Sequence, residues 1–196
     1  RTNMTEFAFS GLGVNPHHGT PANPWDREHR RIPGGSSSGG AVSVTDEMAH
    51  GALGTDTGGS CRIPAALCGL VGFKPTQARI PRDGVVPLSE TLDAVGVLGR
   101  TVGCCAILDA LAAGEVPSMP DRDSQPPHVA VLRNYVLEDV EPQVLTVFER
   151  SLERLRDGGA HVVDLEVPEL DDIADMNAGG GFAAAESFAW HHDLIR

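Results

Sequence analysis

Two clusters of glycines and hydroxyl side chains dominate the first third of the sequence. The first spans Gly34 to Gly40 and reads GGSSSGG, and the second spans Gly54 to Ser60 and reads GTDTGGS. Glycine loses more backbone freedom on folding than any other residue, so ordered clusters of it indicate a backbone that must approach something closely. Acyl transfer needs a nucleophile and N–H donors for an oxyanion. A hydroxyl side chain can be the nucleophile, and the backbone beside it can supply the N–H donors.

The second cluster runs directly into a short helical pattern. Residues 62–69 read RIPAALCG, in which Pro64 suits the first helical position and Gly69 a C-terminal cap. Ser60 would then lie just before a helix N-terminus, among unpaired N–H groups that bind anions and stabilise a developing oxyanion. The alternative for both clusters is a pair of flexible Gly/Ser loops without chemistry.

Two other nucleophiles can be read in the same stretch. Residues 35–39, GSSSG, match the G-x-S-x-G elbow of α/β hydrolases, with Ser37 as the nucleophile. That elbow follows a strand, whereas residues 30–33 read RRIP, and no histidine is marked as the base by its setting. Cys61 adjoins Ser60, but one step along the chain would point its thiol elsewhere.

The histidines and cysteines do not form a metal-binding pattern. His17 and His18 are adjacent, cannot easily share one ion and have no third ligand at suitable spacing, so we expect a loop role. The four cysteines show no CxxC pairing and indicate neither a zinc site nor a disulfide framework. Free thiols in a reducing cytoplasm are expected, with no metal and no cofactor.

Composition and length narrow the class further. The 196 residues carry a formal charge of -12, which disfavours nucleic acid as a direct partner because phosphate surfaces need basic patches. No apolar run approaches the roughly 18 residues of a membrane span, and no signal peptide is visible. Because the sequence opens at Arg1 without an initiator Met and ends at Arg196 inside a helical pattern, we expect a fragment of a longer protein, and the free thiols favour a cytoplasmic one.

Strand and helix patterns alternate, which predicts an α/β fold with a mixed sheet covered by helices on both faces. Strands are expected at 50–54, 70–74, 128–132 and 160–167. Helices are expected at 41–49, 64–68, 102–113, 142–157 and 181–196. Two of these helices have a clear start, since Thr101 is a good N-cap for the helix at 102–113 and Pro142 is a good first residue for the helix at 142–157.

Several segments together resemble the amidase signature family, the serine amidohydrolases with a Ser-Ser-Lys triad. They are RTNMTEFA at 1–8, GGSSSGG at 34–40, GTDTGGSCRIPAALCG at 54–69, GFKPT at 72–76 and TLD at 91–93. The resemblance implies this family's fold, a largely mixed sheet sandwiched by helices.

The resemblance is strong from residue 1 to about Ala113 and looser beyond. We therefore interpret residues 1–196 as a single, partial amidase domain. Its parts are a signature core at about 1–113, a surface connection at 116–127 and a peripheral α/β part at 128–196.

The same resemblance implies roles for the two serine clusters. Ser60, which ends the second cluster, matches the family's nucleophile. Ser36, which follows the two glycines of the first cluster, matches its bridging serine, so a cis peptide bond is expected at Gly35–Ser36. Ser36 would pass protons between Ser60 and a neutral lysine base, whose pKa must be lowered by burial or by a neighbouring positive charge.

Other site residues follow from the positions they match. The N–H groups of Thr57, Gly58 and Gly59, with that of Ser60, are expected to hold the oxyanion. Asp56 and Arg62 are expected to pair and to brace the nucleophile loop, the alternative being that they are ordinary surface charges.

The triad lysine is where this sequence departs from the family pattern. In the family it lies in an apolar strand upstream of the TNM-EFA segment, before residue 1. The only lysine here is Lys74, which matches the structural GFKPT segment, so we do not assign it as the base. Residues 1–196 alone are therefore expected to have little or no amidase activity.

The activity implied is hydrolysis of a carboxylic amide to an acid plus ammonia or an amine, through a seryl acyl-enzyme. Residues 9–20, FSGLGVNPHHGT, resemble stand-alone amidases with small-molecule amide substrates. The first alternative is the glutamine-amidase subunit of a tRNA-dependent amidotransferase, and the second is an inactive fragment or non-catalytic family member. Neither nucleic acid nor a membrane is expected as a partner, and a homo-oligomer stays open.

Overall fold

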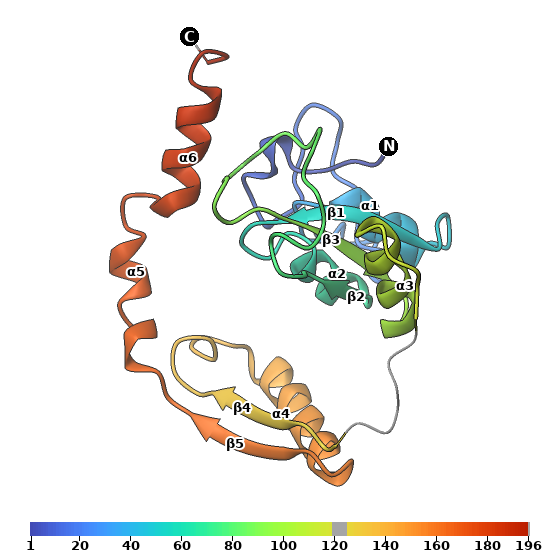
Figure 1. Cartoon of the computed structure of the whole chain (residues 1–196), viewed down its shortest axis with the longest axis vertical. Coiled ribbons are helices and arrows are strands. Elements are labelled where there is room, and N and C mark those ends of the chain that lie inside the picture. Colours follow the sequence, from blue (N-terminus) through green and yellow to red (C-terminus); the bar gives the residue numbers. More distant parts are fainter. Residues whose placement is uncertain (119–124, 196) are drawn as a thin grey trace. The chain divides into compact units, whose positions relative to one another are not determined.

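The computed structural model describes residues 1–118 and 125–195 (Figure 1). Its elements, in chain order, are η1 Glu6–Ala8, α1 Ser38–Thr45, β1 Gly51–Asp56, α2 Arg62–Cys68, β2 Val71–Phe73, β3 Ala94–Gly99, α3 Val102–Ala112, β4 His128–Leu132, α4 Pro142–Asp157, β5 His161–Leu165, η2 Pro168–Leu170, α5 Ile173–Met176 and α6 Gly181–His191. Among the described residues, 1–118 and 182–195 form one compact unit and 125–181 form a second. No described helix has the length and apolar character to cross a membrane.

The centre of the first unit is an antiparallel sheet with the strand order β1–β3–β2 (Figure 1). The central strand β3 reads AVGVLG, and all six of its residues are buried. A short, continuous apolar run of this kind is typical of a strand with neighbours on both edges and cover on both faces. β1 ends opposite the start of β3, with Asp56 paired to Ala94, so the chain leaves the sheet there.

Helices cover both faces of this sheet. On one face Leu98 of β3 packs with Ala41 of α1 and Ala65 of α2 in the hydrophobic core. On the other face α3 approaches so closely that a Cβ at Gly99 would lie 2.9 Å from the Cβ of Cys104. The predicted α/β class with helices on both faces is confirmed, although in the described part of the chain the parallel and antiparallel pairs belong to separate sheets.

Two facing glycines allow the start of α2 to lie directly on the sheet. Gly54 of β1 is paired with Gly96 of β3. A Cβ would lie 2.9 Å from the Sγ of Cys61 at Gly54 and 3.0 Å from the same atom at Gly96, closer than packed side chains tolerate. Cys61, which is fully buried, therefore holds the beginning of α2 against both strands.

The second unit contains a parallel pair, β4 and β5, connected through α4. This is the connection that parallel strands require, because a tight hairpin cannot join them. α4 begins at Pro142 and runs to Asp157, as predicted, and buries Leu152. β4 also has the predicted bounds.

Three other sequence predictions have definite outcomes. Thr101 caps α3 as predicted, because its Oγ1 accepts a hydrogen bond from the N–H of Cys104 at 3.1 Å. α2 begins at Arg62, two residues before Pro64, so the predicted start is wrong. Pro64 is still in the first turn, where a missing N–H costs nothing. The segment predicted as one peripheral part, 128–196, is divided, since residues 182–195 belong to the first unit.

Candidate active site

The two serine clusters, which are separate in the sequence, meet directly in the fold. The N–H of Ser37 donates to the carbonyl oxygen of Ser60 at 3.2 Å, and the N–H of Thr5 donates to the carbonyl oxygen of Ser36 at 3.0 Å. The Gly35–Ser36 peptide bond is cis, as the resemblance predicted. Backbone hydrogen bonds thus fix both clusters and the N-terminal segment to one another.

Both serines assigned to chemistry are buried. Ser60 is 6% exposed and Ser36 is fully buried. Within the described residues, neither the Ser36 Oγ nor the Oγ1 of the neighbouring Thr5 has a hydrogen-bond partner. An unpartnered buried hydroxyl costs free energy, so the Ser36 hydroxyl is available to another polar group. Sequence reasoning did not single out Thr5, although it stands inside the TNMTEFA segment that carried the resemblance.

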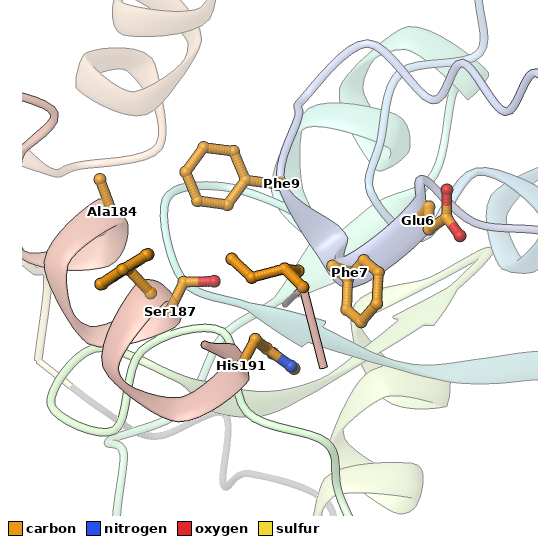
Figure 2. A pocket seen from close by; sticks show the side chains of 8 residues that line it. Glu6, Phe7, Phe9, Ala184, Ser187 and His191 are labelled. Carbon is orange, nitrogen blue, oxygen red and sulfur yellow. The ribbon is translucent and has the colours of Figure 1, made fainter. Parts of the chain in front are cut away.

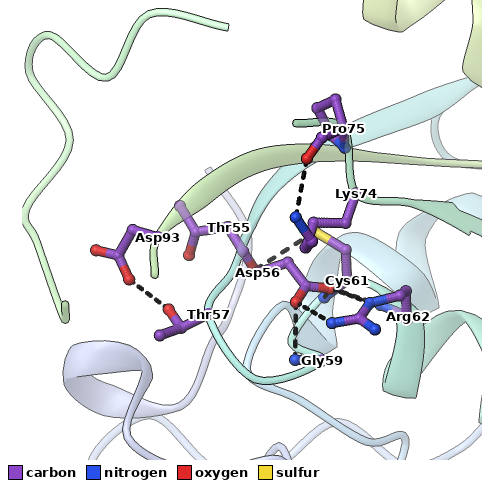
Figure 3. Close-up of polar contacts among 9 residues, drawn as sticks. All are labelled: Thr55, Asp56, Thr57, Gly59, Cys61, Arg62, Lys74, Pro75 and Asp93. Atoms are coloured by element: carbon purple, nitrogen blue, oxygen red, sulfur yellow. Dashed lines mark hydrogen bonds and ion pairs between the residues drawn. The ribbon is translucent and has the colours of Figure 1, made fainter. Parts of the chain in front are cut away.

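Asp56 is the centre of the polar contacts around the nucleophile (Figure 3). Its carboxylate is fully buried at the end of β1 and accepts hydrogen bonds from the N–H groups of Gly59 at 2.7 Å, Cys61 at 3.2 Å and Arg62 at 3.3 Å. The Arg62 guanidinium adds two more, from Nε at 3.0 Å and Nη2 at 2.8 Å. The predicted Asp56–Arg62 pair is therefore present, and the same carboxylate also binds the backbone on both sides of Ser60.

The charge state of Asp56 follows from these contacts. Burial by itself raises the pKa of this carboxyl, but the hydrogen bonds from Arg62 and from the N–H groups of Cys61 and Gly59 outweigh it, and the pKa is lowered. The pKa of Arg62 is raised in turn, first by its hydrogen bonds to Asp56. Asp56 is therefore ionised at neutral pH and can hold the loop in one conformation.

The N–H groups of the loop divide into two sets. The N–H of Gly59 donates a hydrogen bond to Asp56. Gly59 makes this bond with a φ of 126°, an angle that other residues rarely adopt. The resemblance had placed this N–H in the oxyanion site, whereas here it serves the Asp56 contact. In the described structure the N–H groups of Thr57, Gly58 and Ser60 have no protein acceptor. Gly58 has open space around it.

Asp93 is a further polar anchor that the sequence alone did not reveal. Its Oδ1 accepts a hydrogen bond from the Oγ1 of Thr57 (Figure 3). Its Oδ2 accepts one from the N–H of Leu88 at 2.8 Å. The side chain is almost fully buried. Asp93 belongs to the TLD segment, so the resemblance pointed to this position but not to its contact with the nucleophile loop.

The other candidate nucleophiles and the lysine lie in different settings. Burial and the neighbouring Asp56 charge raise the pKa of the Cys61 thiol to about 12, so this thiol stays protonated. Ser37 follows an irregular segment, not the strand that an elbow requires. The Nζ of Lys74 donates to the carbonyl oxygen of Pro75 at 2.9 Å, and no described hydrogen bond joins it to Ser36 or Ser60.

The histidine pair is part of a turn. The N–H groups of His17 and His18 both donate to the Oδ1 of Asn15, at 2.9 and 2.8 Å, and His17 lies 3.3 Å from Glu6. The predicted loop role agrees with these contacts.

Two hollows of the first unit lie beside η1. One, of about 450 Å³, is lined in part by Ser37, Gly54 and Thr55, next to the nucleophile loop. The other, of about 330 Å³, lies between η1 and α6 and is mainly apolar (Figure 2). Phe7 lines both of them, so the two hollows share one wall.

In structural terms the chain is an α/β protein whose two glycine-serine loops meet at a buried pair of serines. The family described as Amidase matches residues 1–194, and the chain belongs to this family. The 2-amino-5-chloromuconic acid deaminase of Comamonas testosteroni is 44% identical over 194 residues, a match that covers 97% of this chain and 42% of that protein.

Solved structures of amidases and of an amidotransferase subunit also resemble this chain. A crystal structure of an amidase superimposes with a TM-score of 0.89 at 35% identity, over 100% of this chain and 43% of that one. A glutamyl-tRNA(Gln) amidotransferase subunit of Thermotoga maritima gives 0.81 at 34% identity, over 95% of this chain and 43% of that one. The chain therefore spans about two fifths of the length of these relatives.

Proposed function

We propose that the enzyme containing this chain hydrolyses the amide bond of a small carboxylic amide, with Ser60 as the nucleophile. The observation that carries the proposal is the junction of the two loops, where Ser37 is bonded to Ser60 and the unpartnered hydroxyl of Ser36 is buried beside them. Family membership supports it, as does the similarity to a deaminase and an amidase.

The proposed reaction proceeds in two steps. The Ser60 Oγ attacks the amide carbonyl carbon and forms a tetrahedral intermediate, whose negative oxygen needs N–H donors. Collapse of the intermediate breaks the C–N bond, and ammonia or an amine leaves with an added proton. Water then attacks the acyl-Ser60 ester by the same route and releases the carboxylic acid.

The oxyanion is assigned to the N–H groups that remain free in the described structure, those of Thr57, Gly58 and Ser60. The open space at Gly58 leaves room for a substrate oxygen there. Asp56 and Arg62 act on the far side of the loop. Asp56, paired with Arg62, accepts a hydrogen bond from the Gly59 N–H, and none of the described hydrogen bonds joins it to the N–H groups of Thr57, Gly58 or Ser60.

Proton transfer requires a base that Ser60 and Ser36 do not themselves provide. Ser36 is proposed to pass the proton of Ser60 to a neutral lysine, because its buried hydroxyl can both donate and accept. Lys74 is not proposed for this role, since its amine is bonded to Pro75. The residue is therefore sought elsewhere in the enzyme.

The second candidate is a glutamine-hydrolysing subunit of an amidotransferase, favoured by the similarity to the Thermotoga maritima amidotransferase subunit. The two candidates use the same loop chemistry and differ in substrate and in assembly. An intact enzyme that releases ammonia from glutamine but not from aryl or alkyl carboxamides would favour the second candidate.

The test uses a fluorophosphonate probe and an anilide substrate on the intact enzyme. Ser60→Ala should abolish both labelling and turnover while the protein stays folded by circular dichroism. Ser43→Ala is a matched control, because among the described residues its hydroxyl bonds only to the carbonyl oxygen of Gly40 within α1. A label that survives Ser60→Ala and maps to Ser37 would instead support the hydrolase elbow.

A further inference from the structure

A partly buried loop connects α6 to the nucleophile loop through hydrogen bonds. Residues 87–93, here called the 87–93 loop, read PLSETLD and lead into the central strand β3. Ser89 is fully buried and Asp93 is 3% exposed, so these two polar side chains depend on protein partners, whereas Glu90 and Thr91 are exposed. The loop and residues 182–195 belong to the same compact unit.

At one end the 87–93 loop is bound by α6. The Glu186 carboxylate accepts hydrogen bonds from the Ser89 Oγ at 2.6 Å, the Thr91 Oγ1 at 2.7 Å and the Thr91 N–H at 3.1 Å. His191, further along the same helix, donates from its Nε2 to the carbonyl oxygen of Pro87 at 3.1 Å. Glu186 is thus the acceptor on which three donors of the loop converge.

At the other end the same loop reaches the nucleophile loop. Asp93 accepts from the N–H of Leu88 through Oδ2, which closes the 87–93 loop on itself. Its Oδ1 accepts from the Thr57 hydroxyl. A continuous path of contacts therefore leads from Glu186 through the loop to Thr57, in the same loop as Ser60.

The hydrogen bond from Thr57 to Asp93 bears on the conformation of the nucleophile loop because of where Thr57 lies in it. Asp56 is fixed by its buried carboxylate and Gly59 by its N–H bond to that carboxylate, so residues 57 and 58 span two anchored points. Gly58 has no side chain, and a Cβ there would meet nothing within 4 Å. Among the described contacts, the hydrogen bond from the Thr57 hydroxyl to Asp93 is the one through which a side chain of residues 57–58 is anchored.

We propose that Asp93 and Glu186 are positioning residues for the oxyanion site: Glu186 fixes the 87–93 loop, and Asp93 orients Thr57 and its neighbouring N–H groups. This inference rests on the proposed function. Donors that are displaced stabilise an oxyanion poorly, whereas they matter little for binding a neutral amide. Loss of either contact should therefore lower kcat more than it changes KM.

The first test is a double-mutant cycle in the intact enzyme, with kcat expressed per active site titrated by a fluorophosphonate. Asp93→Ala and Thr57→Val should each lower kcat by about 10- to 100-fold, less than the full loss of one oxyanion donor. The double variant should be no slower than the poorer single variant, because both remove one interaction. Asp93→Asn, which keeps one acceptor oxygen, should recover part of the rate. Additive losses, or an unchanged kcat per titrated site, would overturn the role of Asp93.

The second test addresses Glu186. Glu186→Ala should lower kcat and speed amide hydrogen exchange at residues 57–60, with which Glu186 shares no described hydrogen bond. Glu186→Gln should recover much of both, because its carbonyl oxygen can still accept from Ser89 and Thr91. Glu115→Ala is the matched control: it removes two hydrogen bonds to Arg79, at 3.0 and 2.7 Å, without touching the 87–93 loop. Equal effects of Glu115→Ala and Glu186→Ala on exchange at 57–60 would contradict the proposal.

Failure of the proposed function gives a different result from failure of this inference. A wild-type enzyme that hydrolyses no amide would overturn the function. Hydrogen exchange at 57–60, measured on the same wild-type protein and variants, would still decide whether Asp93 and Glu186 order the loop. Normal wild-type turnover with variants that exchange and react like wild type would overturn the inference alone.

Discussion

The backbone N–H of Ser37 donates to the carbonyl oxygen of Ser60 across 3.2 Å. This bond joins the two glycine-serine loops at the point where α1 and α2 both begin. Neither side chain takes part in it, so the contact survives most substitutions of either residue. It explains how two loops rich in glycine are ordered enough to carry chemistry, since each is held by the other as well as by the sheet.

The hydroxyl of Ser36 provides the first prediction. Ser36→Ala should lower kcat by about 10²- to 10⁴-fold, the usual worth of assisted proton transfer, because Ser60 loses its path to the base. Stability should not fall, because the removed hydroxyl has no partner among the described residues. Steady-state kinetics and urea unfolding of the intact enzyme measure the two effects. A variant that is unstable and yet fully active when folded would contradict the relay.

Asp56 provides a prediction about stability and pH. Asp56→Asn should reduce the free energy of unfolding at pH 7 by about 2 kcal/mol, because the buried carboxylate loses charge-assisted hydrogen bonds while its partner Arg62 is half exposed. The lowered pKa means that the ionised carboxylate stabilises the fold above its unfolded-state pKa near 4, and that this contribution is lost as the pH falls through the folded-state value. The difference between wild type and Asp56→Asn should therefore shrink in acid.

Urea unfolding at pH 7 and at pH 3 checks this sign. Asp26→Asn is a useful control, because Asp26 also has a lowered pKa but pairs with His29 and Arg31 at the surface. Its effect should be much smaller than that of Asp56→Asn at neutral pH, since solvent screens such pairs. A gap between Asp56→Asn and wild type that widens in acid would show that the Asp56 carboxyl is not ionised in the folded state.

The four cysteines should differ in reactivity in a defined order. Cys104 is only partly buried, and a hydrogen bond from Thr101 lowers its pKa. Burial raises the pKa of Cys105, of Cys68 to about 11 and of Cys61 to about 12. Because the thiolate is the reactive form, iodoacetamide at pH 8 should modify Cys104 first and Cys61 only after unfolding. Peptide mass spectrometry measures the order of modification. Early modification of Cys61 in the folded enzyme would support Cys61 as the nucleophile in place of Ser60.

Lys74 should be dispensable for catalysis. Its amine is bonded to the carbonyl oxygen of the next residue, so Lys74→Met in the intact enzyme should change kcat by less than about threefold. The measurement is anilide hydrolysis over a range of pH, with Ser36→Ala as the impaired reference. A large loss together with a shifted pH profile would identify Lys74 as the base after all.

Local signals predicted local structure well. Pro142 and Thr101 fixed the starts of α4 and α3, because caps and first-turn prolines act within one turn of the helix. Gly69 ends α2 in the left-handed conformation that a C-terminal glycine favours. Ser36 and Ser60, at which chemistry is proposed, lie in segments with a specific family resemblance, and the backbone brings these segments together.

The central strand could not be predicted in the same way. β3 contains Gly96 and Gly99, and glycine inside a strand weakens the local signal. What makes it a strand is pairing with β1 and β2 on either side and the close approach of Cys61 at Gly96, none of which is visible locally.

Contacts between distant side chains were missed for a related reason. Asp93 and Thr57 are 36 positions apart, and Glu186 and Ser89 are 97 positions apart. A single sequence records the residue types but not their partners. The direction of the Gly59 N–H was likewise hidden, since it depends on a backbone angle that glycine leaves unrestricted.

The separation of 97 positions between Ser89 and Glu186 also bears on how the chain folds. Contacts so distant in sequence form late, because the entropy of closing a long loop must be offset before they stabilise anything. During synthesis, Ser89 leaves the ribosome well before its partner. Reactivity of Ser60 towards a probe would then rise only after the Ser89–Glu186 contact has formed. The time course of this reactivity would therefore report when folding is complete.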